Sequence, residues 1–219
     1  IGGWYDGYRD AVFRMLENLK SPVKAMIGPW NHKFPNWADP SPAVEWRAEA
    51  VRWFDQWLKG RETGIMNEPR LSAFIRDWHP PGSNVAEIKG SWIWTDTWPS
   101  KEISWETYFP GAKGALSKST PDQSAAIFKR KYIPSAGTEA GGSVMWWGDW
   151  SPDQRTGDSK SLVFETEVLN ENLSILGLPL VHLSVSVDAP HANWFVRLND
   201  VAPDGQVTIV TGAGGNGTH

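Results

Sequence analysis

An acidic and a basic side chain occupy matching places in two short phrases near the start of the chain. In IGGWYDGY, Asp6 follows a short apolar run, and in MIGPWNH, His32 follows another. Functional groups of parallel α/β sheets gather where strands end, and a helix between the two phrases would make their strands neighbours. An aspartate can orient a histidine that moves a proton, which is general acid–base chemistry. The pattern therefore predicts that Asp6 and His32 meet within about 3 Å.

Both residues also have purely structural interpretations. Asp6 precedes a predicted helix, and aspartate is a common residue at a helix N-cap. His32 lies in a tryptophan-rich loop, where a histidine can be simply packed and hydrogen-bonded. From the residues alone, the acid–base pair and these structural roles both stay open.

Other kinds of chemistry find less support in the sequence. The chain has no cysteine, which excludes thiolate metal sites and a cysteine nucleophile. His79, His182 and His191 share no close spacing with carboxylates, so no metal site is predicted. Asp200 and Asp204 flank a predicted turn and are interpreted as turn formers rather than calcium ligands. We therefore predict no metal and no cofactor.

The first 66 residues predict alternating helices and strands. Apolar residues at helical spacing predict a helix over residues 8–20, followed by a short buried strand over residues 23–27. A second helix is predicted to begin at Ser41-Pro42 and to end at Gly60. Its buried stripe is expected to be Val44, Ala48, Val51, Phe54 and Leu58. Residues 1–66 are thus predicted to be the C-terminal part of an α/β domain.

After residue 66 the pattern changes to short strands separated by turns. The alternation is clearest over residues 180–187, where every second side chain is apolar. Further strands are predicted over residues 71–78, 125–133, 162–168, 194–198 and 207–210. Many short strands with such turns favour a β-sandwich of jelly-roll type. Residues 67–219 are therefore predicted to be an all-β domain, with an open strand edge or a disordered tail after Thr211.

The composition restricts the kinds of partner. The 219 residues are 40% hydrophobic and 21% charged with a net charge of -4, which is typical of a globular protein. No basic stripe suits nucleic acid, and no apolar run approaches the roughly 20 residues of a membrane helix. The 15 tryptophans are expected to be mostly buried in the sandwich or at its junction with the first domain. The alternative is an exposed aromatic face, as in a carbohydrate-binding or structural interaction module.

Several phrases resemble a known family of serine hydrolases. GGWYDGY, IGPWNH and RWFDQWLKG are similar, in this order, to the end of the catalytic domain in the cocaine esterase and X-prolyl dipeptidyl-peptidase family. SWIWTDTWP, SPDQRTGDSKSLVFETEVL and VSVDAPHANWFVRLNDVAPDG resemble that family's C-terminal jelly roll. The resemblance implies an α/β-hydrolase fold with a jelly-roll β-sandwich, and a Ser–Asp–His triad with Asp6 as acid and His32 as base. It also implies that Tyr8 lines the acyl pocket; packing at the start of the helix is the alternative for this residue.

The chain also departs from that family. The nucleophile elbow, G-x-S-x-G, is absent from the sequence. The resemblance therefore implies a fragment that supplies the aspartate and histidine but not the serine, and whose jelly roll is cut short. The expected partners are small esters, amides or short peptides, cleaved through an acyl-enzyme, and an open strand edge would favour a homo-oligomer. Neither the acyl group nor the compartment, cytoplasmic or secreted, follows from these residues.

Overall fold

A four-stranded sheet organises the first half of the chain. The computed structural model describes residues 1–37, 39–82, 85–120, 127–137 and 152–218. The strands lie in the order β1 (Gly2–Gly3), β2 (Ala25–Gly28), β3 (Leu71–Arg76) and β4 (Gly90–Thr95). β1, β2 and β3 are parallel, whereas β4 is antiparallel to β3. The carboxyl ends of β1 and β2 therefore lie side by side, as the sequence predicts.

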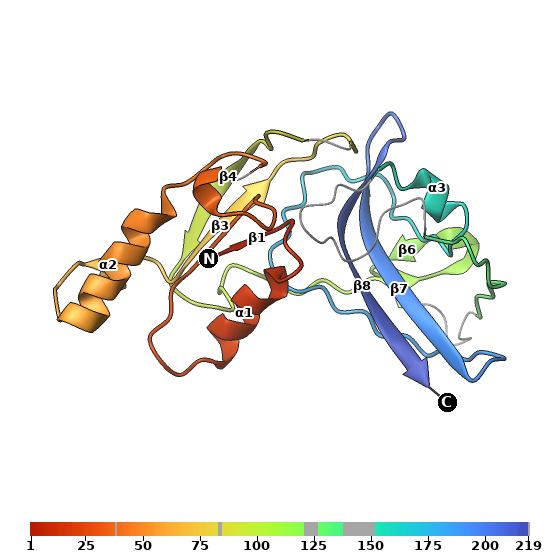
Figure 1. Ribbon diagram of the computed structural model, residues 1–219. Helices are drawn as coiled ribbons and strands as arrows, with labels where there is room; N and C mark the ends of the chain where they lie inside the picture. The colour runs from red at the N-terminus through yellow and green to blue at the C-terminus, as the bar shows by residue number, and fades with distance from the viewer. Residues whose placement is uncertain (38, 83–84, 121–126, 138–151, 219) are drawn as a thin grey trace.

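Helix α1 (Arg9–Asn18) covers one face of this sheet (Figure 1). Its buried side chains Val12, Phe13 and Leu16 pack against Ile27 of β2 and Leu71 of β3. Phe13 and Leu16 are each only 1% exposed, and burial of a side chain of this size contributes roughly 1.5–3 kcal/mol. The predicted helix and the strand after it are confirmed, with the small boundary differences that frayed ends produce.

The opposite face of the sheet carries a second buried cluster. Phe74 points away from α1 because neighbouring side chains of a strand alternate between faces. It packs with Tyr5 and Ile88, and Trp92 of β4 adds to the cluster. Both faces of the short sheet are therefore covered near Tyr5, the residue before Asp6.

Helix α2 (Trp46–Lys59) begins later than predicted. Glu45, not Ser41, is its N-cap residue, and its side chain accepts a hydrogen bond from the Arg47 amide. The backbone of Ser41 is used elsewhere, because its N–H donates to Ala86 O and its carbonyl accepts from Ile88 N. The predicted end is confirmed, since Gly60 takes the left-handed conformation with φ of 64°.

The predicted buried stripe of α2 is wrong. Val51, Phe54 and Leu58 are 59%, 54% and 76% exposed, and no residue of α2 is fully buried. Helical spacing shows which side of a helix is apolar, but it does not supply a neighbour to cover that side. In the described part of the chain, that side of α2 has no such neighbour.

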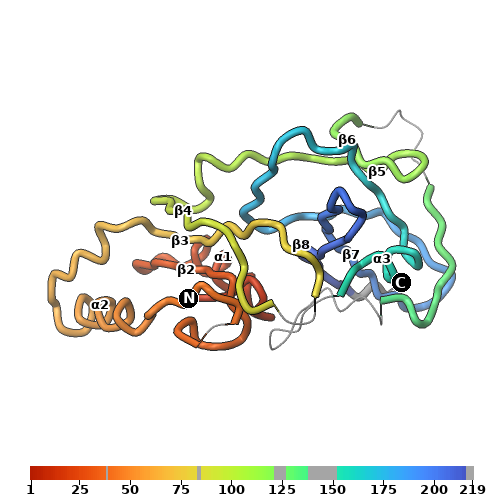
Figure 2. Tube along the Cα trace, turned by 90° about the horizontal axis from the view of Figure 1, so that it is seen from above, coloured from red at the N-terminus to blue at the C-terminus, as the bar shows by residue number. Residues whose placement is uncertain are grey.

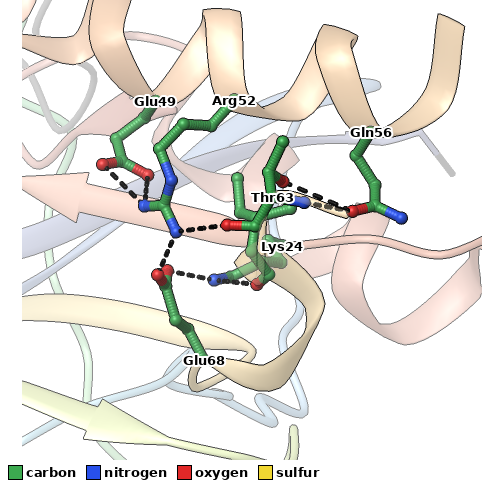
Figure 3. A network of polar contacts seen from close by, with 7 residues as sticks. Lys24, Glu49, Arg52, Gln56, Thr63 and Glu68 are labelled. Carbon is green, nitrogen blue, oxygen red and sulfur yellow. Dashed lines mark hydrogen bonds and ion pairs between the residues drawn. The ribbon is translucent and has the colours of Figure 1, made fainter. Parts of the chain in front are cut away.

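A polar network ties α2 to the segment that follows it and to the start of β2 (Figure 3). Arg52 donates to both carboxylate oxygens of Glu49 and to Glu68. Lys24 Nζ binds the other oxygen of Glu68 at 2.9 Å, and Gln56 Oε1 accepts from the Thr63 amide at 3.1 Å. The network lies at the amino-terminal end of β2, the end away from His32.

The Glu68 carboxylate should make stability depend on pH. Arg52 and then Lys24 lower its pKa below the ordinary 4.5, so its contribution is complete above that pH and disappears as the pH falls through the lowered value. Because the side chain is 42% exposed, we expect Glu68→Gln to cost about 1 kcal/mol or less at neutral pH, and progressively less as the pH falls below 4.5. Urea unfolding at several pH values measures this, with Glu62→Gln as the control. A cost that is the same at every pH would contradict the assignment.

Two separate two-stranded sheets form in the second half of the chain. β5 (Phe109–Pro110) pairs with β6 (Leu116–Ser117), and β7 (His191–Val201) pairs with β8 (Val207–Thr218), all antiparallel. The short helix α3 (Arg155–Asp158) lies beside the long hairpin. Seen from above, the two halves of the molecule lie next to each other (Figure 2). The described residues also contain short 3₁₀ helices over Pro35–Trp37, Ile65–Asn67 and Ala112–Gly114.

The hairpin confirms two strands and contradicts one of the two alternatives expected after Thr211, the disordered tail. Both predicted strands, 194–198 and 207–210, lie within β7 and β8. The turn between them closes through Gly205, whose φ is 83°, and Asp204 accepts from the Gln206 amide, as expected of a turn former. The same expectation is wrong for Asp200, which lies within β7 opposite Thr208. The chain after Thr211 is not a disordered tail, because β8 continues to Thr218 in register with His191. Backbone pairing with β7 therefore holds this glycine-rich end in a strand.

Other predicted strands are absent from the described residues. Residues 127–133 and 180–187 lie outside every strand, residues 125–126 lie outside the described part of the chain, and residues 162–168 contain only an isolated bridge at Glu165. Val181, Leu183 and Val185, which the alternation placed on one buried face, are 55%, 53% and 42% exposed. A strand needs a hydrogen-bonded neighbour as well as an apolar face, and the sequence pattern specifies only the face. The described residues therefore form no closed sandwich.

The sheet also bears on the predicted division near residue 66. β3 and β4 lie after it, yet β3 continues the parallel sheet begun by β1 and β2. From the second half, Leu176 and Leu178 pack onto the cluster beneath α1. The division into residues 1–66 and 67–219 stays a prediction, but the structural units on either side share a sheet and a core.

Candidate active site

Asp6 and His32 meet at the carboxyl ends of β1 and β2. Asp6 Oδ2 lies 2.9 Å from His32 Nδ1, and the two side chains are 16% and 32% exposed. An ionised carboxylate can only accept, so Nδ1 donates the proton of this hydrogen bond. In the neutral ring this leaves the lone pair on Nε2, where a general base needs it. The predicted contact is present, and its catalytic role stays a prediction.

The second oxygen of Asp6 holds the turn that leads into α1. Asp6 Oδ1 accepts from the Tyr8 amide at 2.8 Å, and the Asp6 amide donates to Gly3 O at 3.1 Å. One oxygen therefore stabilises the turn before α1, while the other contacts His32. The expected N-cap role of Asp6 is wrong, because the N-cap residue of α1 is Tyr8. The two contacts of Asp6 are compatible, because each uses a different oxygen. The turn also fixes the direction of the carboxylate toward the imidazole.

Tryptophans anchor the two loops that carry the pair. The indole N–H of Trp4 donates to Phe74 O at 2.7 Å, and the ring stacks on Phe13. The indole N–H of Trp30 donates to Pro42 O at 2.8 Å, and this ring is only 1% exposed. The repeated glycine–tryptophan phrase thus has a structural purpose, since each strand ends at a glycine and each loop is then fixed by a buried or half-buried indole.

Gly3 permits the two strand tips to approach each other closely. A Cβ at this position would lie 2.1 Å from Trp30 O, a backbone atom that cannot move aside alone. We expect Gly3→Ala to destabilise the chain by about 2–3 kcal/mol, the upper part of the range for overpacking. It should also weaken the contact of Asp6 with His32, because the tips must separate. Urea unfolding measures the stability, and Gly111→Ala, which meets only contacts of 3.7 Å or more, is the matched control. Equal stabilities of the two variants would contradict this explanation.

Tyr8 lies against the imidazole of His32. The two ring centroids are 5.9 Å apart at a tilt of 48°, and the tyrosine is 58% exposed. Such exposure does not fit a side chain that packs the start of α1 into the core. Tyr8 is therefore placed where it can form one wall beside the pair, and its role in binding substrate stays a prediction.

Sequence reasoning missed two buried neighbours of the pair. Asn31, 6% exposed, precedes His32, and its Oδ1 has no hydrogen-bond partner among the described residues. Tyr5, 2% exposed, precedes Asp6 and contacts Arg76 and His79. No spacing rule could have found the latter set, because more than seventy residues separate Tyr5 from its partners in the sequence.

Among the described residues, no other pocket, metal site or membrane helix suggests another active site. A hollow of about 710 Å³ lies at the opposite end of β2, lined by Lys20, Lys24, Met66 and Arg70 among others. No three histidine, aspartate or glutamate side chains of the described segments gather as they would around a metal ion. None of the helices described has the length and apolar character needed to cross a membrane.

The expectation that most tryptophans are buried is wrong for the described residues. Trp30 alone among them is fully buried, and Trp146, Trp147 and Trp150 lie outside the described part of the chain. Five others are exposed: Trp37, Trp57, Trp78, Trp94 and Trp105. Stacking on a sugar ring favours coplanar indoles, but Trp53 and Trp57 of α2 are tilted by 52°. This pair gives the carbohydrate-binding alternative no support.

Comparison with known proteins finds relatives over nearly the whole chain. Residues 63–216 match the family described as X-Pro dipeptidyl-peptidase C-terminal non-catalytic domain. The chain is 27% identical to "Putative serine esterase Mb1866c" of Mycobacterium bovis, over 95% of this chain and 33% of that protein. It is 26% identical to the cocaine esterase of Rhodococcus sp., over 93% of this chain and 38% of that protein. The resemblance predicted from the sequence is thereby confirmed as distant homology.

A solved structure shares the fold. The crystal structure of an aminopeptidase from a marine sediment Thaumarchaeota archaeon superimposes with a TM-score of 0.58 over 99% of this chain and 39% of that one. At 21% identity this similarity shows the fold alone. The chain spans only about a third of the length of the curated relatives that it matches.

Proposed function

The chain belongs, through residues 63–216, to the X-Pro dipeptidyl-peptidase C-terminal non-catalytic domain family, and on this premise we propose that it is part of a serine hydrolase. Asp6 and His32 are the acid and base of the proposed triad. Both residues precede the segment that matches the non-catalytic domain, as residues of a catalytic domain should. The observation on which the proposal rests is the 2.9 Å contact between Asp6 and His32 at adjacent strand tips.

The proposed reaction begins with a serine hydroxyl supplied from outside these 219 residues. Its oxygen attacks the carbonyl carbon of an ester or amide, and His32 Nε2 takes the hydroxyl proton. Asp6 stabilises the imidazolium that forms, through the hydrogen bond donated by Nδ1. The tetrahedral intermediate then collapses to an acyl-enzyme, and the imidazolium gives its proton to the departing alkoxide or amine. In the second half of the reaction His32 takes a proton from water, which attacks the acyl-enzyme carbonyl. The acid leaves and the proton returns to the serine oxygen.

Small esters are the substrate class that the relatives favour. The homologues whose names state an activity include a cocaine esterase, which supports a small ester as the substrate. Tyr8, beside His32, offers an aromatic face to any apolar part of such a substrate. Amides and short peptides use the same steps, and the choice between them depends on parts of the site that these residues do not form.

Labelling with a fluorophosphonate tests the proposed function. In the longer protein in which we propose that this chain occurs, the reagent should modify one serine, and mass spectrometry should locate it outside residues 1–219. His32→Ala should abolish labelling, because the serine loses its base. His182→Ala, which removes an exposed histidine of the second half, should label normally. Labelling that survives His32→Ala, or a label on a serine within these 219 residues, would overturn the assignment.

A further inference from the structure

The buried phenol of Tyr5 lies at the centre of a hydrogen-bonded network next to Asp6, whose members Arg76 and His79 are half-buried. Its oxygen accepts a hydrogen bond from Arg76 Nη1 and lies 2.7 Å from His79 Nε2. The Arg76 guanidinium also lies over the tyrosine ring, 4.9 Å from its centroid. At 2% exposure Tyr5 has no room to turn toward water, so these partners determine where its hydroxyl points.

The hydrogen bonds around the Tyr5 hydroxyl have one consistent direction from donor to acceptor. Pro80 O can only accept, so His79 Nδ1, at 3.0 Å, donates to it. His79 Nε2 then accepts from the Tyr5 hydroxyl, which itself accepts from Arg76. Burial lowers the pKa of His79 and raises that of Tyr5, so the neutral imidazole and the intact phenol that this order requires are both favoured.

Arg76 and His79 also bind β8, on the edge that is not paired with β7. Arg76 Nη2 donates to Val210 O at 2.6 Å, and Arg9 Nη2 donates to Gly212 O at 3.1 Å. Thr208 donates its hydroxyl proton to the carbonyl of His79 at 3.0 Å. These alternate positions of β8 face the N-terminal sheet and α1, which lie on the β8 side of the hairpin (Figure 1). The hairpin is therefore hydrogen-bonded to the two residues that hold Tyr5.

We propose that Tyr5 is a positioning residue for the Asp6–His32 pair, and that Arg76 and His79 make its position depend on the docking of β8. The Tyr5 amide donates to Trp30 O at 3.0 Å, so fixing Tyr5 fixes the Asp6 loop against the His32 loop. A misplacement of about 1 Å in a reacting group can cost 10²-fold in rate. The inference rests on the proposed function for its catalytic consequence, but its geometric part concerns this chain alone.

Tyr5→Phe tests the inference, since it keeps the buried ring and removes the hydroxyl. In the 219-residue chain, NMR reports two hydrogen bonds of Asp6, the Tyr8 amide by its exchange rate and the His32 Nδ1 proton by its low-field signal. We expect the Tyr8 amide to exchange about 10-fold faster and the His32 signal to broaden. In the longer protein we expect kcat to fall about 10-fold with KM unchanged. Tyr132→Phe, at a residue that is 82% exposed, is the matched control.

Thr208→Val tests the dependence on β8 without touching Tyr5. It keeps a β-branched side chain in the strand and removes the hydrogen bond to His79 O, and it should move both NMR signals in the same direction, by about 3-fold in exchange. It also replaces Tyr5→Phe if that variant does not fold. If the folded variants leave the Tyr8 exchange rate and the His32 signal unchanged, the inference is wrong. If the signals move but no serine is labelled in the longer protein, the geometric inference stands and the proposed function fails.

Discussion

Replacing His32 by alanine is expected to lower kcat of the longer protein by about 10⁴–10⁶-fold, the range for removal of a triad base. The imidazole has no substitute within reach in the described structure, since His79, the other histidine near the sheet, binds Tyr5 and Pro80. Hydrolysis of a p-nitrophenyl ester, followed by absorbance, measures the loss. A serine without its base reacts too slowly to form the acyl-enzyme at a useful rate.

Asp6→Asn tests the role of the carboxylate more specifically than His32→Ala tests that of the imidazole. It preserves shape and leaves an oxygen that can still accept from the Tyr8 amide, but the other group of the side chain becomes an NH₂ donor. The Nδ1–H of His32 then has no acceptor there, the ring favours the wrong tautomer, and kcat should fall by about 10⁴-fold. Asp10→Asn, at an exposed acid in the first turn of α1, should leave kcat unchanged. An Asp6→Asn enzyme with nearly normal turnover would remove Asp6 from the proposed triad.

The contact between Asp6 and His32 was easier to predict than the fold around it, for a physical reason. The glycine and tryptophan that end β1 and β2 are local signals, and parallel pairing brings whatever follows them together. The contact of Asp6 with His32 therefore followed from two short phrases and one topological rule. Gly60 and the Pro203–Gly205 turn were equally local, because each ends or reverses the chain by its own backbone preference.

The errors arose wherever the outcome depends on a distant partner. The apolar side of α2 is plain in the sequence, but its exposure depends on what packs there. The alternating segment 180–187 has the right face for a strand and lacks a hydrogen-bonded neighbour among the described residues. The contacts of Tyr5 with Arg76 and His79 could not be predicted for the same reason, because no local pattern in either segment indicates the other.

The contacts of Tyr5 bring the segment that matches the non-catalytic domain next to the candidate site. Arg76 and His79 lie within the segment that matches the non-catalytic domain, yet both bind the residue adjacent to Asp6. The family description and the geometry are compatible, because a residue can support a site without taking part in the chemistry. The hairpin that Arg76 reaches is then a structural support for the two strand tips.

The 219-residue chain by itself should hydrolyse p-nitrophenyl esters no faster than a weak, imidazole-like background. It contains the proposed acid and base but no nucleophile elbow, so the acyl-enzyme route is not open to it. The oxyanion donors that accompany such an elbow are also expected outside these residues, and the loss of one donor alone costs roughly 2.7–4 kcal/mol of transition-state stabilisation. The remaining background should come from His32 acting as a simple base on water.

The comparison is made between the isolated chain and the longer protein on the same ester. The longer protein should show saturation with substrate, whereas the rate with the isolated chain should rise linearly with ester concentration. His32→Ala should reduce the small background of the isolated chain, whereas His182→Ala should leave it largely unchanged, since His32 is retained. Saturable turnover by the isolated chain at an enzyme-like rate, unaffected by Asp6→Asn, would mean that a nucleophile lies within these residues. The assignment of the site to Asp6 and His32 would then be wrong, because catalysis would not depend on their contact.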